Sequence, residues 1–247
     1  MTAVRRFLGA ATLAAVLLAI VFAVYSFTKS RPQDLPWTPL GLGETPGLFT
    51  ARKIAALGED FAQCRALLDH AGVRHIALEP VRPAQSACGY DDGVRSTGGA
   101  VALRYAPAGP GMACPVAAGM AMLEWNVIQP AAKRHFGERV RTIEHFGSYN
   151  CRRLYGRSEG DWSQHATADA IDLAGFVLTD GTRISIVRDW SGTGEDGAAK
   201  AAFLRDVRDG ACRLFTTVLS PDYNAAHRDH FHIDTANRGA MGWNACR

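Results

Sequence analysis

Three histidines and three acidic residues lie within fifteen positions near the end of the chain, in the segment SPDYNAAHRDHFHID at Ser220–Asp234. His227, His230 and His232 follow the pattern H-x-x-H-x-H. In an extended strand, residues two apart point to the same face, so His230 and His232 would project together. Imidazole nitrogens are common zinc ligands, and catalytic zinc sites use three protein ligands. The segment predicts part of a metal site; surface histidines on a solvated strand are the alternative.

A second polar cluster, SQHATADAID at Ser163–Asp172, lies about sixty residues upstream. It contains His165 and Asp172, whose spacing is too long for one helical face and requires the intervening loop to fold back. Ser163 lacks the G-x-S-x-G surroundings of a nucleophile and is expected to form a turn hydrogen bond. Taken alone, the pair also fits an exposed loop histidine and a turn aspartate. Considered together with the histidine segment, the second cluster predicts the remaining ligands of a metal site.

The two motifs together resemble the zinc peptidases that cut bacterial peptidoglycan: D-Ala-D-Ala carboxypeptidases and dipeptidases, and the penicillin-insensitive murein endopeptidase. In this chain the motifs read S-x-H-x-x-A-x-A-x-D and H-x-x-H-x-H. The resemblance implies that His165, Asp172 and His232 bind one Zn²⁺. These peptidases usually have glycine at the position of Ala168, and alanine adopts a positive φ only at a cost.

The chain from about Cys64 to Arg247 also resembles the extensin-like C-terminal domain family of bacterial proteins. The segments that carry this likeness include GSYNCR at 147–152 and HRDHFHID at 227–234. Arg152 resembles the arginine that holds substrate and transition-state charge in the carboxypeptidases. Arg153 is adjacent and could take that role instead, and an arginine on a surface loop is the alternative.

The general base remains open between two patterns. In the carboxypeptidases, an acid three residues before the last metal ligand accepts the proton, and here that residue is Asp229. In the endopeptidases, histidines flank the same ligand, at the positions of His227 and His230. Asp229 is favoured as the base, because a carboxylate close to the metal can carry a proton from water to the leaving amine. His230 would then orient substrate or stabilise the oxyanion.

The chain begins with an apolar stretch, Phe7–Phe27, that is uncharged and long enough to cross a bilayer, which needs roughly 20 apolar residues. Arg5 and Arg6 precede it and predict a cytoplasmic tail at residues 1–6. We expect an uncleaved anchor at 7–27 in the inner membrane, a Pro/Gly-rich linker at 28–58 and a periplasmic domain at 59–247. A cleaved signal peptide, cut after Ser26, is the alternative.

The charge and the cysteine content of the exported part indicate which partners and which cross-links to expect. Without Arg5 and Arg6, 25 of the 27 Lys and Arg residues remain against 24 acids. This balance gives no basic footprint for nucleic acid. All six cysteines follow residue 27 and none forms a C-x-x-C pair. In an oxidising compartment they predict up to three disulfides, whose pairing the sequence does not determine; free buried thiols are the alternative.

The remaining patterns indicate an α+β domain with a small, mainly antiparallel sheet and flanking helices. Asp180-Gly181 between two apolar runs predicts a hairpin, and Pro130 should kink or divide a long helix. The expected elements are helices from Glu59, over 115–136 and over 198–215; strands at 73–78, 100–105, 140–146, 171–178, 183–188 and 230–234; and loops at 82–99 and 216–224.

These expectations converge on one hypothesis. The protein would hydrolyse a peptide bond in peptidoglycan stem peptides or cross-links, with zinc polarising the carbonyl. A different class of function is a metal-stabilised domain that binds or scaffolds the cell wall without catalysis. An exported structural domain without metal is a third.

Overall fold

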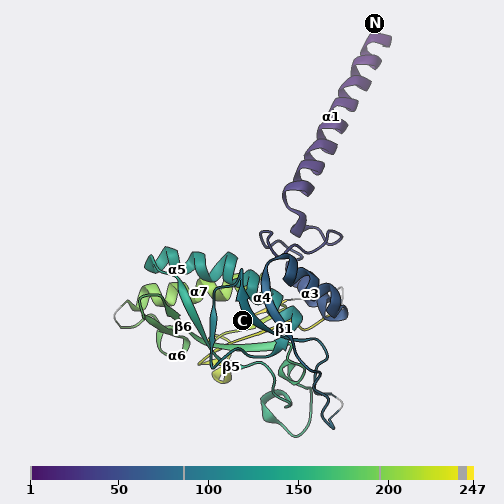
Figure 1. The fold of residues 1–247 in the computed structure, drawn as a ribbon. Helices are drawn as coiled ribbons and strands as arrows, with labels where there is room; N and C mark the ends of the chain where they lie inside the picture. Colours follow the sequence, from purple (N-terminus) through teal and green to yellow (C-terminus); the bar gives the residue numbers. More distant parts are fainter. Residues whose placement is uncertain (1, 86, 195, 239–243) are drawn as a thin grey trace.

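The computed structural model describes residues 2–85, 87–194, 196–238 and 244–247. Helix α1 (Thr2–Ser30) projects away from the rest of the molecule (Figure 1). Within the described residues, it is the one helix with the length and apolar composition to cross a membrane, and none of its apolar span is buried in the protein. The stretch expected as an anchor lies inside this helix.

The segment at 28–58, expected as a linker, folds against the domain instead of extending freely. It forms the helices η1 (Pro32–Asp34), α2 (Thr50–Ala56) and η2 (Leu57–Glu59). Ile54 is fully buried in the core. The Lys53 ammonium donates to the Pro32 carbonyl at 3.2 Å and to the Thr38 hydroxyl at 2.8 Å. Proline and glycine limit the length of these elements without preventing them from packing.

The described strands form two sheets around the core. The smaller has the order β1 (Val73–Ala77), β2 (Gly93–Gly99), β4 (Met112–Ala113). The larger has the order β10 (Ala245–Cys246), β8 (Thr217–Leu219), β9 (Phe231–Asp234), β6 (Ala170–Leu178), β5 (Val140–Gly147), β3 (Arg104–Ala106), with β7 (Arg183–Ser185) also on β6. Most pairs are antiparallel; β3–β5 and β8–β10 are parallel. The α+β expectation is confirmed.

Helices cover the sheets. They are α3 (Phe61–His70), α4 (Cys114–Leu123), the π turn η3 (Glu124–Ile128), α5 (Gln129–Phe136), α6 (Ile186–Asp189) and α7 (Gly197–Ala211). The expected division of the long helix falls at the π turn, just before Pro130. Pro130 has no N–H to donate, so the regular ladder cannot continue through it.

Aromatic packing joins the helices to the larger sheet. The Phe203 ring on α7 lies edge-on to Phe176 of β6, with centroids 5.2 Å apart, and to Phe136 of α5, at 5.7 Å. Phe176 and Phe203 are completely buried. Figure 1 shows α5 and α7 side by side over the strands. This packing gives β6 a rigid base, and β6 carries one of the expected metal ligands.

The sequence-based element assignments were wrong in four places. Strand β2 lies inside the region 82–99 that was expected as a loop. Its glycine-rich composition is typical of turns, but its residues pair with β1. Strand β8 lies inside the expected loop 216–224, and the strand expected at 100–105 begins only at Arg104. The strand expected at 183–188 ends at Ser185, and its second half belongs to the helix α6. The hairpin at Asp180-Gly181 is confirmed by the antiparallel pairing of β6 with β7.

All six cysteines form disulfides, as expected for an exported domain: Cys64–Cys114, Cys88–Cys151 and Cys212–Cys246. The second of these links loop residues near β2 to the segment that follows β5. A bridge closing a loop of this size stabilises a fold by about 2–4 kcal/mol in the usual case. It also fixes the segment at 148–152, which contacts the site described below.

Candidate metal centre

Two antiparallel strands place one acid and one histidine directly opposite each other. Asp172 on β6 pairs with His232 on β9, and on its other side Asp172 faces Gly147 of β5. Phe231 and Ile233 are buried on either side of His232 in the sequence, as strand alternation requires. The sheet therefore holds Asp172 and His232 at fixed positions on one face.

A short 3₁₀ turn, η5 (Gln164–Thr167), brings His165 to the same place. The Ser163 hydroxyl caps its start by accepting from the His165 N–H, which is the turn role expected for this serine. The His165 carbonyl accepts from the Asn150 N–H at 2.8 Å. The turn ends at Ala168, which is fully buried and left-handed, with φ 60°. Alanine occupies the conformation that usually favours glycine.

The three side chains form a compact triangle of ligand atoms. His165 Nε2 lies 3.1 Å from His232 Nδ1 and 3.1 Å from Asp172 Oδ1, and His232 Nδ1 lies 3.0 Å from Asp172 Oδ1. Tetrahedral zinc, with bonds of about 2.0–2.1 Å, separates its ligand atoms by roughly 3.3 Å. Among the described residues, this is the one group of three or more His, Cys, Asp or Glu side chains arranged closely enough to hold a metal.

The far nitrogen of each histidine is held by an acceptor. His165 Nδ1 donates to the Ser148 carbonyl at 2.6 Å, and His232 Nε2 donates to Asp234 Oδ2 at 3.2 Å. In a neutral imidazole only one nitrogen carries a proton. These bonds therefore direct the lone pairs of His165 Nε2 and His232 Nδ1 into the triangle. Metal-ligating histidines are oriented in the same way.

Opposite charges dominate the titration of this cluster. Burial raises the pKa of the Asp172 carboxyl, but hydrogen bonds and charge from His165 and His232 outweigh it and hold that pKa well below its usual range. Burial lowers the pKa of His232, but hydrogen bonds and charge from Asp172 and Asp234 outweigh it and raise that pKa to about 9. Without metal, the His232 imidazole therefore carries a proton near neutral pH. The surroundings of His232 thus stabilise a positive charge at this position.

His230 and Asp229 lie at the edge of the triangle as a hydrogen-bonded pair. His230 Nδ1 donates to Asp229 Oδ1 at 2.9 Å, and His230 Nε2 lies 3.6 Å from Asp172 Oδ1. Both residues precede β9, so strand alternation does not force their side chains apart. The His230 imidazole thus lies between the ligand triangle and the Asp229 carboxylate.

His227 is buried next to His230. Its Nδ1 lies 2.8 Å from Asn224 Oδ1, and its ring is 5.2 Å from the His230 ring and 6.0 Å from the His232 ring. Burial, together with the neighbouring His230 and His232, lowers the pKa of His227 to about 4. His227 is therefore neutral at pH 7, with Nδ1–H donating to Asn224 and Nε2 left as an acceptor.

The two adjacent arginines have different surroundings. The Arg153 guanidinium stacks on the Trp162 ring, 4.4 Å from its centroid, and donates to the Gly160 carbonyl. Arg152 is half-buried, and its carbonyl accepts from the Ser163 N–H at 3.1 Å. Since Arg153 is engaged within its own loop, Arg152 is the better candidate for a substrate contact.

Three residues that sequence reasoning did not assign support the site: Ser148, Asn224 and Asp234. Asp234 had a detectable signal, because it lies two residues after His232 and so on the same strand face. Asn224 lies three residues before His227, a spacing that suits a local cap. Ser148 acts through its backbone carbonyl, which no side-chain pattern reveals. Its hydroxyl donates to the Ala170 carbonyl at 2.6 Å and fixes the segment.

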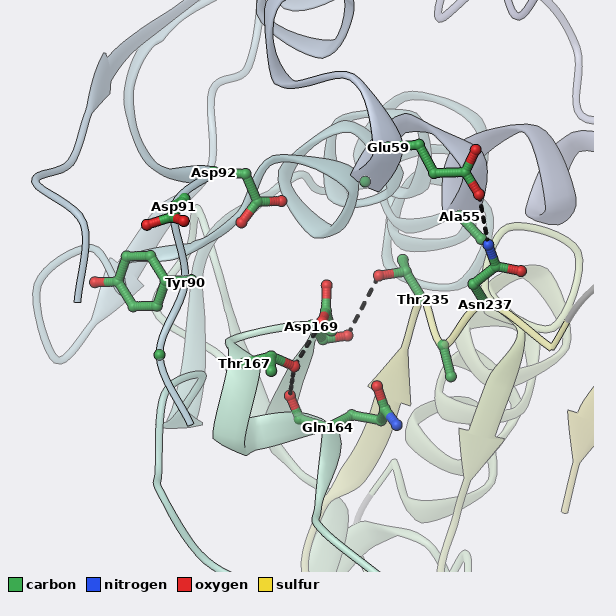
Figure 2. A pocket seen from close by; sticks show the side chains of 13 residues that line it. Ala55, Glu59, Tyr90, Asp91, Asp92, Gln164, Thr167, Asp169, Thr235 and Asn237 are labelled. Atoms are coloured by element: carbon green, nitrogen blue, oxygen red, sulfur yellow. Dashed lines mark hydrogen bonds between the residues drawn. The ribbon is translucent and has the colours of Figure 1, made fainter. Parts of the chain in front are cut away.

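A separate pocket of about 380 Å³ lies behind the turn that carries His165 (Figure 2). Gln164 and Thr167 of this turn line it, together with Asp169 just after the turn, Asp92 and Thr235. Burial raises the pKa of Asp169 to about 6. The described lining contains neither a metal ligand of the triangle nor a basic residue. The pocket is therefore separate from the metal cluster.

Comparison with known proteins identifies the family of this domain. A family model described as "Extensin-like protein C-terminus" matches residues 62–247, about three quarters of the chain. No curated protein and no solved structure matches the chain. The matched region includes every residue of the candidate metal centre. The chain belongs to the extensin-like protein C-terminus family.

Proposed function

We propose that the protein is a zinc-dependent peptidase that hydrolyses a peptide bond in the stem peptides or cross-links of bacterial peptidoglycan. One observation carries the proposal. Two imidazole nitrogens and a carboxylate oxygen converge within 3.1 Å of one another, while acceptors hold the far nitrogen of each imidazole. The resemblance of the two motifs to zinc peptidases of the cell wall supplies the substrate class.

The donor set fits zinc. Two imidazoles and one carboxylate are a ligand combination typical of catalytic zinc sites, which leave a further position for water or substrate. His165, Asp172 and His232 would hold the ion. When bound, zinc would supply Lewis-acid chemistry by polarising the scissile carbonyl and favouring deprotonation of the attacking water.

The pair of His230 and Asp229 would move the proton. The sequence favoured Asp229 as the acceptor, but the geometry favours a shared arrangement, because Asp229 contacts the far nitrogen of His230. His230 Nε2 would accept the proton from the attacking water and return it to the leaving amine. Asp229 would hold the imidazole in that orientation and stabilise its positive charge, as an acid does for a catalytic histidine.

Two further residues would bind substrate. His227, neutral with Nε2 as an acceptor, would take a hydrogen bond from a substrate N–H. Arg152 would hold a substrate carboxylate or the developing oxyanion charge, because a guanidinium offers several donors in one plane. These roles require no charge change at either residue during turnover.

The apolar helix α1 supports the proposed location. As an uncleaved signal anchor in the inner membrane it would hold the domain in the periplasm, where peptidoglycan lies and disulfides persist. The folded segment at 32–57 would keep the domain close to the membrane surface. The anchor and the three disulfides thus support a wall substrate, and neither supports nucleic acid as a partner.

A panel of purified muropeptides tests the proposal. The full chain in detergent, loaded with zinc, should release products from at least one stem or cross-link type, and a chelator should abolish the release. Replacement of Asp229 by asparagine should lower turnover and retain zinc. A wall-binding domain without catalysis would retain its binding in this variant, and absence of cleavage across the panel would reject the enzymatic proposal.

A further inference from the structure

Large aromatic side chains are exposed next to His227 and His230, the two histidines beside the candidate metal centre. Phe146, near the end of β5, is 62% exposed, and its ring lies edge-on to His230 with centroids 5.7 Å apart. Tyr223 is 43% exposed and lies 5.4 Å from the His227 ring. Each ring therefore contacts a histidine of the site while keeping much of its surface open.

A third exposed ring, that of Tyr155, lies near Asn224. Tyr155, in the short turn η4 (Leu154–Gly156), is 52% exposed and left-handed, with φ 57°. Its hydroxyl accepts from Asn224 Nδ2 at 3.4 Å, and Asn224 directly follows Tyr223 in the sequence. We call Phe146, Tyr155 and Tyr223 the aromatic rim.

The loop at 152–163 holds Tyr155 in place. A backbone bridge between Arg153 and Trp162 closes the loop, and Cys151, just before it, is tied to Cys88. A bulky residue at positive φ costs of order 1–3 kcal/mol and persists only where surrounding contacts impose it. The loop thus holds Tyr155 in a strained backbone conformation with its ring exposed, although burying the ring would stabilise the fold more.

The chemistry of the rim indicates a ligand with flat apolar faces. Aromatic rings next to a few polar groups are the usual lining of sites that bind ring-containing molecules. Peptidoglycan stems consist mainly of small and charged residues, whereas the glycan strand consists of pyranose rings with apolar C–H faces. The Arg157 guanidinium, 5.5 Å from the Tyr155 ring, adds a cation suited to the carboxylates of the same polymer.

We infer that the aromatic rim binds sugar rings of the glycan strand that carries the scissile peptide. The inference rests on the proposed function and narrows it, because it makes glycan-linked peptide the preferred substrate over free peptide. Phe146 contacts His230, and Tyr223 contacts His227. The rim therefore lies along the path of a substrate that passes through it.

Matched substrates test the inference. We would measure kcat/KM of the full, zinc-loaded chain on one cross-linked peptide with and without its disaccharides. Each of Phe146→Ala, Tyr155→Ala and Tyr223→Ala should lower the preference for the glycan-linked form by roughly 3- to 10-fold, since an aromatic contact contributes about 0.5–1.5 kcal/mol. Val187→Ala, an exposed apolar residue on α6, should retain the preference. Equal kcat/KM for the two substrates in the unaltered chain would overturn the inference.

A binding measurement separates this inference from the proposed catalysis. Peptide-free glycan strands should bind the metal-free protein, more weakly after Tyr155→Ala or Tyr223→Ala and unchanged after Val187→Ala. Tyr155→Phe retains the ring and should retain binding, which controls for damage to the loop. Such binding without hydrolysis of any muropeptide would reject the catalytic proposal and support the rim. Identical binding by all variants, or none by the unaltered chain, would overturn the rim.

Discussion

The Nε2 atom of His165 and the Nδ1 atom of His232 face each other at 3.1 Å across the candidate metal centre. Both far nitrogens are held by acceptors, so in neutral rings both near nitrogens carry lone pairs. Two lone pairs at this distance repel unless a cation lies between or beside them. A proton satisfies this need in the metal-free protein. The proposed zinc ion would satisfy it with Asp172 as a third ligand.

Removal of one ligand should abolish tight zinc binding. His165→Ala, Asp172→Ala and His232→Ala should each weaken zinc affinity by at least about 100-fold, more than the loss of an outer contact does. Competition with a chromogenic chelator measures the change. His70→Ala, an exposed histidine at the end of α3, is the matched control and should bind zinc normally. Retention of tight binding in all three ligand variants would reject this centre.

Asp234 should matter although it is not a ligand. Asp234→Asn keeps the size of the side chain but removes the carboxylate that holds His232 Nε2. We expect zinc affinity to fall by about 10- to 100-fold, as for other partners of metal-bound histidines. Asp180→Asn, in the exposed hairpin turn, provides the control. An affinity equal to that of the control would show that the Asp234 contact does not orient the metal ligand.

Zinc binding should release a proton near neutral pH. His232, with a pKa of about 9 in the metal-free protein, must lose its proton to bind zinc through Nδ1. Titration calorimetry at pH 7 in buffers of different ionisation enthalpy should therefore report about one proton released per ion. The affinity should rise between pH 7 and pH 9. A release close to zero at pH 7 would contradict the proposed ligand role of His232.

The raised pKa of His232 also determines how the free energy of unfolding changes with pH. The pKa of His232 is higher in the metal-free fold than its ordinary value of 6.5. Its contribution to the free energy of unfolding is therefore fully present below pH 6.5 and is lost as the pH rises through about 9. Denaturant titrations of the chelated protein should show this loss between pH 7 and pH 10, and His232→Gln should remove that part of the pH dependence.

The roles of His230 and Asp229 are separable by kinetics. His230→Ala should lower kcat by about 10²- to 10⁴-fold, the usual contribution of a general base, and Asp229→Asn should lower it less. Both variants should retain zinc, because neither residue belongs to the ligand triangle. Asp222→Asn is the control, since its carboxylate contacts Trp190 and Arg208 instead. A larger effect at Asp229 than at His230 would return the base to Asp229.

The sequence determined the elements that have a clear period or turn signal. The Asp180-Gly181 hairpin and the alternation through Phe231, His232 and Ile233 needed no tertiary information. The strand β2 did need tertiary information. Its glycines are typical of a turn, and two of them, Gly98 and Gly99, have a positive φ. The pairing of β2 with β1 outweighs that local preference.

The candidate site also combines residues that the sequence indicated with contacts that only the fold creates. The resemblance of the two motifs to zinc peptidases singled out His165, Asp172 and His232, and the structure brings their ligand atoms together. The contact between Ser148 and His165 could not be predicted, since it uses a backbone carbonyl seventeen residues away. The position of Tyr155 beside Tyr223 depends on a closed loop and a disulfide pairing. Neither of these follows from local sequence.

Ala168 tests how closely the turn at His165 is constrained. Ala168→Gly relieves a left-handed alanine, by roughly 1–2 kcal/mol, but loses a buried methyl group and adds freedom to the unfolded chain, which together cost a similar amount. We expect the free energy of unfolding to change by less than about 1 kcal/mol. Ala168→Val should lower it by about 2 kcal/mol or more, through overpacking at a fully buried position. Equal stability of the two variants would contradict this conformation.

Activity as a function of zinc content is the most direct test of the central claim. Metal-free full-length protein would receive increasing equivalents of zinc, and product release from a cross-linked muropeptide would be followed at each step. We predict that the rate rises in proportion to zinc and levels off at about one equivalent per chain, the content of a three-ligand catalytic site. His165→Ala should show no such rise. Hydrolysis that is independent of zinc, or its absence at every zinc content, would contradict the proposed function.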